Sequence, residues 1–149
     1  MARILIERRT PLPAGEAWRR LTSWEHHARH VPFTTVTVTT PPPTRVGTRF
    51  TARTGVGRAA FDDPMEVVRW EPPARDRPGR CRLEKRGSTV LGWAELEVTG
   101  RGAGSLVVWR EEVRVRGLPR LLEPPTAWAG RLLFGRVLAG LLAESRTGP

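Results

Sequence analysis

The feature that most constrains the fold of this chain is its apolar C-terminal stretch. Residues Leu118 to Arg146 read LPRLLEPPTAWAGRLLFGRVLAGLLAESR, after a sequence that otherwise has mostly the pattern of strands. A helix that is hydrophobic nearly all round must be covered nearly all round. The simplest cover is a curved antiparallel sheet built from the preceding strands. We expect a hollow between such a sheet and the helix, of the kind that holds small molecules.

Short alternating segments predict strands along most of the remaining chain. In residues 2–10, Ile4 and Ile6 alternate with Arg3 and Glu7, which is strand periodicity. A short helix is expected from Pro13 and an irregular stretch over 24–32. Further strands are expected at 34–40, 47–54, 65–71, 80–85, 90–99 and 106–116, separated by prolines and glycines. This order is of the α+β class and predicts a single domain over residues 1–149.

The charge of the chain is strongly positive, at +10 formally, and Lys85 is its only lysine. Two interpretations are open: a high-GC genome, because arginine codons are GC-rich, or a basic surface for nucleic acid or anionic lipid. The arginines are spread along the chain, with no run of five basic residues and no interleaved tyrosine or phenylalanine for base stacking. We therefore expect no nucleic-acid partner.

Cys81 is the only cysteine, so an intramolecular disulfide and a cysteine-based zinc site are both excluded. The N-terminus runs directly into a strand and has no signal-peptide pattern, which predicts a cytoplasmic protein. The apolar segment 127–143 is short for a bilayer span and is interrupted by Arg131 and Arg136. We expect no stable membrane insertion. Either a monomer or a homodimer is compatible with the sequence.

Local signatures over nearly the whole chain resemble a known superfamily. They are the opening strand followed by PAGEAWRRLTSWEHHARHVP, then VGTRF, VVRWEPP, GWAELEV and SLVVWREEV, and finally the apolar helix. Together they resemble the START-like, or helix-grip, superfamily (SRPBCC), and within it the polyketide cyclase/dehydrase and lipid-transport group. The resemblance implies a curved seven-stranded antiparallel sheet wrapped around a long C-terminal helix. It also implies two short helices after the first strand, the second over residues 25–31.

Glu111 is the candidate catalytic residue. In the last strand Val107, Trp109, Glu111 and Val113 share one face, and period-two logic directs that face inward. A carboxylate in an apolar interior is costly unless it is paired or protonated. Glu111 is then either a proton-transfer or ligand-binding group, or a structural partner of Arg53, Lys85 or Arg69.

Candidate ligand-binding residues come from the inward faces of the other strands and from the helix. Small residues at Gly92 and Ala94 would leave room for a ligand, and Lys85 would lie at the rim with its stem buried. Trp109 and Trp128 would stack on a flat molecule. The full set is Phe50, Ala52, Leu83, Lys85, Gly92, Ala94, Leu96, Trp109, Val113, Trp128, Leu132 and Gly135. Ordinary core packing is the alternative interpretation for each of them.

A metal site is one hypothesis for His26, His27 and His30, because His26 and His30 have the spacing of one helical turn. It needs a third ligand, for which Glu25 and Asp62 are the candidates, and solvated loop histidines are the simpler interpretation. We expect no metal site and no cofactor.

The predicted function is binding of a small hydrophobic or aromatic molecule between sheet and helix. Members of the resembled superfamily bind such molecules; some cyclise polyketides and others carry lipids. If the protein promotes cyclisation or dehydration, Glu111 would be the proton-transfer group, and Arg53 or Lys85 would polarise a carbonyl. The alternatives are a non-catalytic carrier or sensor of lipid or quinone, and a protein-interaction module without a ligand.

Overall fold

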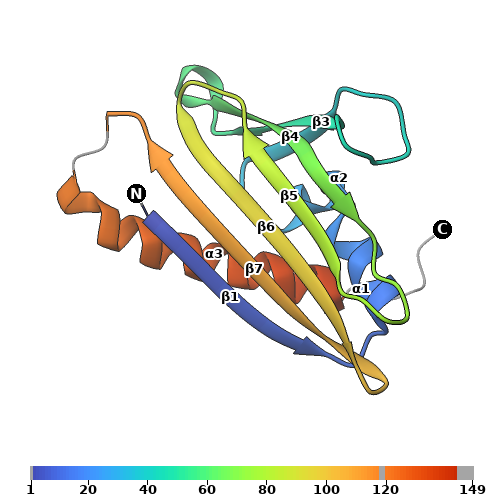
Figure 1. The fold of residues 1–149 in the computed structure, drawn as a ribbon. Helices are drawn as coiled ribbons and strands as arrows, with labels where there is room; N and C mark the ends of the chain where they lie inside the picture. Colours follow the sequence, from blue (N-terminus) through green and yellow to red (C-terminus); the bar gives the residue numbers. More distant parts are fainter. Residues whose placement is uncertain (1, 118–119, 144–149) are drawn as a thin grey trace.

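A single sheet of seven antiparallel strands dominates the computed structural model, which describes residues 2–117 and 120–143 (Figure 1). The strands are β1 (Ala2–Thr10), β2 (Thr34–Val38), β3 (Arg49–Thr54), β4 (Phe61–Glu71), β5 (Gly79–Lys85), β6 (Val90–Arg101) and β7 (Gly104–Val115). Their order across the sheet is β1-β7-β6-β5-β4-β3-β2, so that β1 and β2 form the two edges. The α+β class and the seven-stranded sheet expected from the resemblance are both confirmed.

Two short helices connect β1 to β2. They are α1 (Ala14–Leu21) and α2 (Trp24–His27), and α2 continues into the 3-10 turn η1 (Ala28–His30). The second helix implied by the resemblance is therefore present. The interpretation of residues 24–32 as an irregular stretch, made from the residue pattern alone, was wrong. Trp24 explains the difference, because its burial against the core holds this short helix in place.

The C-terminal helix α3 (Glu123–Ala143) follows the 3-10 turn η3 (Arg120–Leu122). It lies on one side of the sheet, behind β1 and β7 in Figure 1. The remaining residues of the predicted C-terminal stretch, 118–119 and 144–146, lie outside the described residues.

The sheet covers only one face of α3. Val137, Leu138 and Leu141 are fully buried, but Trp128 is 65% exposed and Leu132 is 48% exposed. The expectation that the helix is covered nearly all round was wrong. A single sheet encloses only one side of a helix, and within the described residues no other layer covers the outer flank of α3.

Strand β4 begins at Phe61 rather than at the predicted Met65. Asp62, Asp63 and Pro64 are unfavourable in strands, which is why the sequence pattern placed the start later. Pro64 pairs with Thr51 of β3. It directly precedes Met65, which is the first residue of β4 that pairs with β5. The longer strand matters for the site, because it brings Phe61 and Asp63 onto the inner face.

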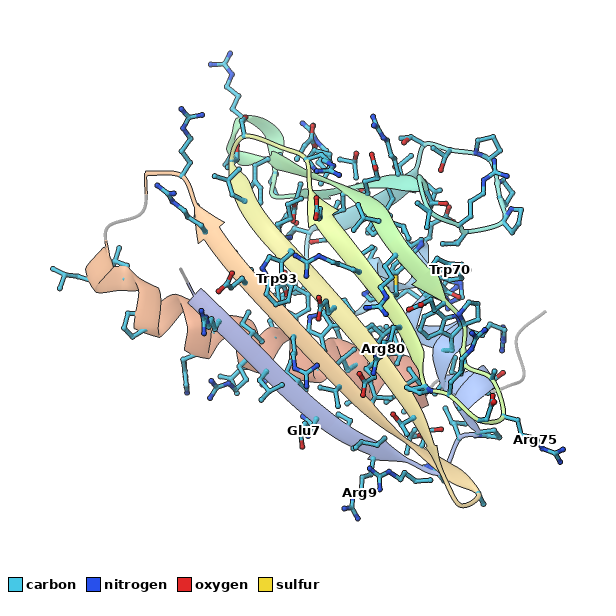
Figure 2. All side chains as sticks on the ribbon, viewed as in Figure 1. Glu7, Arg9, Trp70, Arg75, Arg80 and Trp93 are labelled. Carbon is cyan, nitrogen blue, oxygen red and sulfur yellow. The ribbon has the colours of Figure 1, made fainter. Side chains whose placement is uncertain are left out.

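The outer face of the sheet carries charges of both signs. Arg3 contacts Glu112 at 2.8 Å and Arg80 contacts Glu97 at 3.3 Å. Figure 2 shows Arg80 and Trp93 on this face, on the side of the sheet away from α3. These two arginines are opposed by carboxylates on neighbouring strands. No helix within the described ranges is long and apolar enough to cross a bilayer.

Candidate ligand-binding cavity

A cavity of about 300 Å³ lies between the inner face of the sheet, α2 and α3. Its lining includes the fully buried Val137 and also Phe61, which is 41% exposed. Its lining residues are Trp24, His27, Val31, Thr34, Val36, Phe50, Ala52, Thr54, Phe61, Asp63, Met65, Leu83, Lys85, Val90, Ala94, Trp109, Glu111, Val113, Val115, Leu133, Phe134 and Val137.

Aromatic rings form two stacked pairs along the cavity wall. Trp24 of α2 stacks on Phe50 of β3, with ring centroids 4.7 Å apart and planes 11° apart. Trp109 of β7 stacks on Phe134 of α3 at 5.9 Å and 19°. The His27 ring lies 6.2 Å from that of Trp109. Flat, rigid walls of this kind favour flat, apolar ligands.

One corner of the cavity is polar, and it consists of Asp63, Lys85 and Glu111. The Lys85 ammonium donates to Asp63 Oδ2 at 2.7 Å and lies 3.5 Å from Glu111 Oε1. The Trp109 indole N–H donates to Glu111 Oε2 at 3.2 Å. The side chains of Lys85 and Glu111 are only 5% and 3% exposed, and that of Asp63 is 14% exposed. We call these three residues the polar corner.

Strand register assembles the polar corner. Lys85 pairs with Met65, two residues from Asp63 along β4, and Glu111 pairs with Ala94 on β6. Because side chains two residues apart share a face, all three corner residues point to the inner side of the sheet. Asp62, the residue before Asp63 on β4, has the opposite orientation. Asp62 points outward and pairs with Arg53 at 3.2 Å.

Burial and charge act in opposite directions on the corner residues. Burial raises the pKa of Glu111 above its ordinary value, and the Asp63 carboxylate adds to this, whereas Lys85 and the Trp109 N–H oppose it. Burial alone would lower the pKa of Lys85, but the attraction of Glu111 and Asp63 outweighs it, so that the pKa is raised. Lys85 is therefore a stable ammonium, and burial favours the protonated form of Glu111.

The structure brings most of the sequence-predicted site residues together. Those that line the cavity are Glu111, Phe50, Ala52, Leu83, Lys85, Ala94, Trp109 and Val113. Of the partners considered for Glu111, Lys85 is the one in contact. Arg53 pairs with Asp62 and Arg69 with Glu71, both on exposed sites. The expected position of Lys85 at a wet rim was wrong, since its ammonium is buried.

Five predicted residues lie away from the cavity. Trp128 and Leu132 are on the exposed flank of α3. Gly135 is beside Arg8, because a Cβ there would lie 3.1 Å from the Arg8 guanidinium. Leu96 is buried on the predicted inner face but packs in the filled core. At Gly92 φ is +131°, and a Cβ would meet the Glu112 carbonyl oxygen at 1.8 Å, so the backbone requires glycine there independently of any ligand.

Several lining residues were absent from the sequence prediction. Asp63 and Met65 alternate with Asp62 and Pro64, and this period-two pattern would have identified them had the strand been extended to Phe61. Phe134 and Val137 had no such signal, because apolar residues occur on all sides of the helix.

The three histidines have separate environments. His27 lines the cavity, and its Nε2 lies 2.8 Å from the Leu21 carbonyl oxygen. The His30 ring packs against α3 at Gly140. Among the described residues no group of three or more His, Cys, Asp or Glu side chains is arranged to hold a metal ion.

Solved structures of low sequence identity share this fold. TTHA0849 from Thermus thermophilus aligns with a TM-score of 0.75 and 16% identity over 94% of both chains. Zhui aromatase/cyclase from a Streptomyces species, R1128, aligns with a TM-score of 0.67 and 11% identity over 99% of this chain and 98% of that one. The di-domain ARO/CYC BexL from the BE-7585A biosynthetic pathway gives 0.69 and 12%, with 97% of this chain covering 50% of that protein.

No family model matches the sequence, and no curated protein sequence matches it. At identities this low, the structural likeness establishes the helix-grip fold.

Proposed function

We propose that this helix-grip protein binds a small hydrophobic or aromatic molecule in the cavity between its sheet and α3. The observation that carries the proposal is the cavity itself. It holds about 300 Å³ of space, its walls are mainly apolar and aromatic, and its polar groups converge at one corner. Convergence of a few polar groups in an apolar cavity is the usual arrangement of a small-molecule site.

Burial of a ligand in this space would be favourable mainly through removal of apolar surface from water, at about 25 cal/mol per Å². The stacked pairs would add flat contact surfaces, and the polar corner would orient a hydroxyl or carbonyl group. Two structural neighbours, an aromatase/cyclase and an ARO/CYC protein, support an aromatic or polyketide-like ligand. The substrate class proposed here is therefore polycyclic or polyketide-like rather than a simple sugar or nucleotide.

Native mass spectrometry of the purified protein, followed by denaturation and small-molecule analysis, tests this proposal. We expect a co-purifying hydrophobic compound, or uptake of an added aromatic probe such as anthracene-2-methanol with 1:1 stoichiometry. Ala94→Leu would extend a side chain into the cavity and should abolish uptake. Ala139→Leu is the matched control, because Ala139 is exposed on α3. Equal uptake by both variants would contradict binding in this cavity.

We further propose that Glu111 transfers protons during cyclisation or dehydration of the bound molecule. Its raised pKa favours the protonated form that a general acid needs, and its position at the cavity corner supports contact with a ligand. In a dehydration, the Glu111 carboxyl would donate its proton to a departing hydroxyl group, which leaves as water. The resulting carboxylate would then accept a proton from the carbon next to a carbonyl, whose C–H electrons form the new double bond.

Glu111→Gln distinguishes a catalytic role from a structural one. The expected result is retained binding of a neutral aromatic probe with loss of turnover of a poly-β-ketone substrate, by about 10²-fold or more. Unchanged binding and unchanged turnover would contradict a role for Glu111 in either. Retention of the ligand without turnover by the wild-type protein would favour the alternative of a carrier or sensor. An interior that takes up no ligand would favour an interaction module.

A further inference from the structure

The polar corner contains more acidic than basic groups. Asp63 and Glu111 supply two carboxyl groups, and Lys85 supplies one ammonium. No other lysine or arginine is among the described residues that line the cavity. His27, on α2, is the remaining lining residue with a titratable base, and the residues of α3 at the cavity, Leu133, Phe134 and Val137, are apolar.

The ammonium and N–H donors of the corner are already engaged. The Lys85 ammonium faces Asp63 Oδ2 at 2.7 Å, Glu111 Oε1 at 3.5 Å and Met65 Sδ at 3.9 Å. The Trp109 indole N–H is engaged by Glu111. In contrast, Asp63 Oδ1 is buried and has no hydrogen-bond partner among the described residues. The corner thus offers an unused acceptor and no unused cation.

An incoming carboxylate would therefore meet like charge. With Glu111 protonated, Asp63 and Lys85 balance one another, and a bound carboxylate would leave a net negative charge in an apolar interior. With Glu111 ionised, the corner would already be negative before the ligand arrived. Uncompensated charge of one sign in a buried site is strongly unfavourable.

The corner has an excess of acidic groups, whereas the whole molecule has an excess of basic ones. The chain carries a formal charge of +10, so its long-range field attracts anions. Net charge alone would therefore favour fatty-acid-like or other carboxylate ligands. The geometry of the buried residues leads to the opposite expectation.

We propose that the polar corner selects the ligand by its charge, so that the cavity accepts uncharged molecules and amines but rejects carboxylates. This inference rests on the proposed function, because it assigns a ligand class to the same cavity. An uncharged hydroxyl or ketone leaves the charge balance of the corner intact. An ammonium compensates the second carboxylate when Glu111 is ionised.

Three probes of matched shape test the selection. They are naphthalene-2-methanol, 2-(aminomethyl)naphthalene and naphthalene-2-carboxylate, each titrated against the wild-type protein near neutral pH by calorimetry. We expect the alcohol and the amine to bind at least about tenfold more tightly than the carboxylate. Carboxylate affinity equal to that of the alcohol would overturn the charge selection and leave cavity binding intact. Failure of all three probes to bind would overturn the proposed function and this inference with it.

Two neighbouring aspartates provide a matched pair of variants. Asp63→Asn removes one carboxylate from the corner and should raise carboxylate affinity by about tenfold or more, with little change for the alcohol. Asp62→Asn removes the adjacent carboxylate, which pairs with Arg53 outside the cavity, and should change neither. If Asp63→Asn does not fold, the ratio of carboxylate to alcohol affinity is measured for Glu111→Gln instead. An unchanged ratio of carboxylate to alcohol affinity in a folded corner variant would overturn the proposal.

Discussion

Cys81 is a thiol that its surroundings make unreactive. It lies on the inner face of β5 at 2% exposure, and burial raises its pKa to about 12. Because the thiolate is the reactive form, we expect almost no labelling of the native protein by a disulfide reagent and full labelling after unfolding. Its flanking arginines, Arg80 and Arg82, point to the outer face and do not activate it. Rapid stoichiometric labelling without loss of structure would contradict this.

At the scale of single residues, the strand faces were largely predictable and the helix faces were not. A strand with one apolar face has a period of two, so Glu111 and Lys85 could be assigned to the interior from sequence. Apolar residues occur on all sides of helix α3, so their pattern does not indicate which flank meets the sheet. For that reason Trp128 is among the ligand-binding residues predicted from the sequence, and Phe134 is not. The ion pair of Lys85 with Asp63 also required the register between β4 and β5.

At the scale of the helices, two glycines have opposite roles. A Cβ at Gly140 of α3 would lie 2.4 Å from Nδ1 of His30, whereas a Cβ at Gly15 of α1 has no neighbour within 4 Å. We expect Gly140→Ala to destabilise the protein by about 1–3 kcal/mol through overpacking, and Gly15→Ala to stabilise it by roughly 0.5–1 kcal/mol. Urea unfolding measures both, and a double-mutant cycle of Gly140→Ala with His30→Ala should recover much of the loss. Additive effects would contradict the contact.

Helix α1 contains an acid-sensitive contact. Hydrogen bonds from Arg19 and Arg20 lower the pKa of Glu16 from 4.5 to about 2, and Arg20 also donates to the Leu142 carbonyl oxygen of α3. Because the folded-state pKa is depressed, the contribution is fully present above the unfolded value of 4.5 and is lost as pH falls toward 2. We expect the stability difference between wild type and Glu16→Gln to shrink across this window in urea titrations. A constant difference would contradict the linkage.

At the scale of the whole molecule, ligand binding and global unfolding should be linked. A ligand that binds only the folded state at 100 times its Kd adds about 2.7 kcal/mol. For a domain of this length that corresponds to a rise in Tm of about 5–10 °C. Thermal unfolding with and without naphthalene-2-methanol measures the shift. Ala94→Leu should show no such rise, and an equal rise in that variant would place the ligand elsewhere.

The polar corner also bears on how the chain avoids mispaired strands. Its three residues come from β4, β5 and β7, so the corner forms only when these strands have reached their final register. A slip of β5 by one residue toward its N-terminus would replace Lys85 in the interior with Glu84. Every side chain of the strand would change face, so Arg80, Arg82 and Glu84 would enter the apolar interior and Cys81 and Leu83 would leave it. The buried charges of the corner and the alternating pattern of β5 thus both disfavour the misregistered sheet.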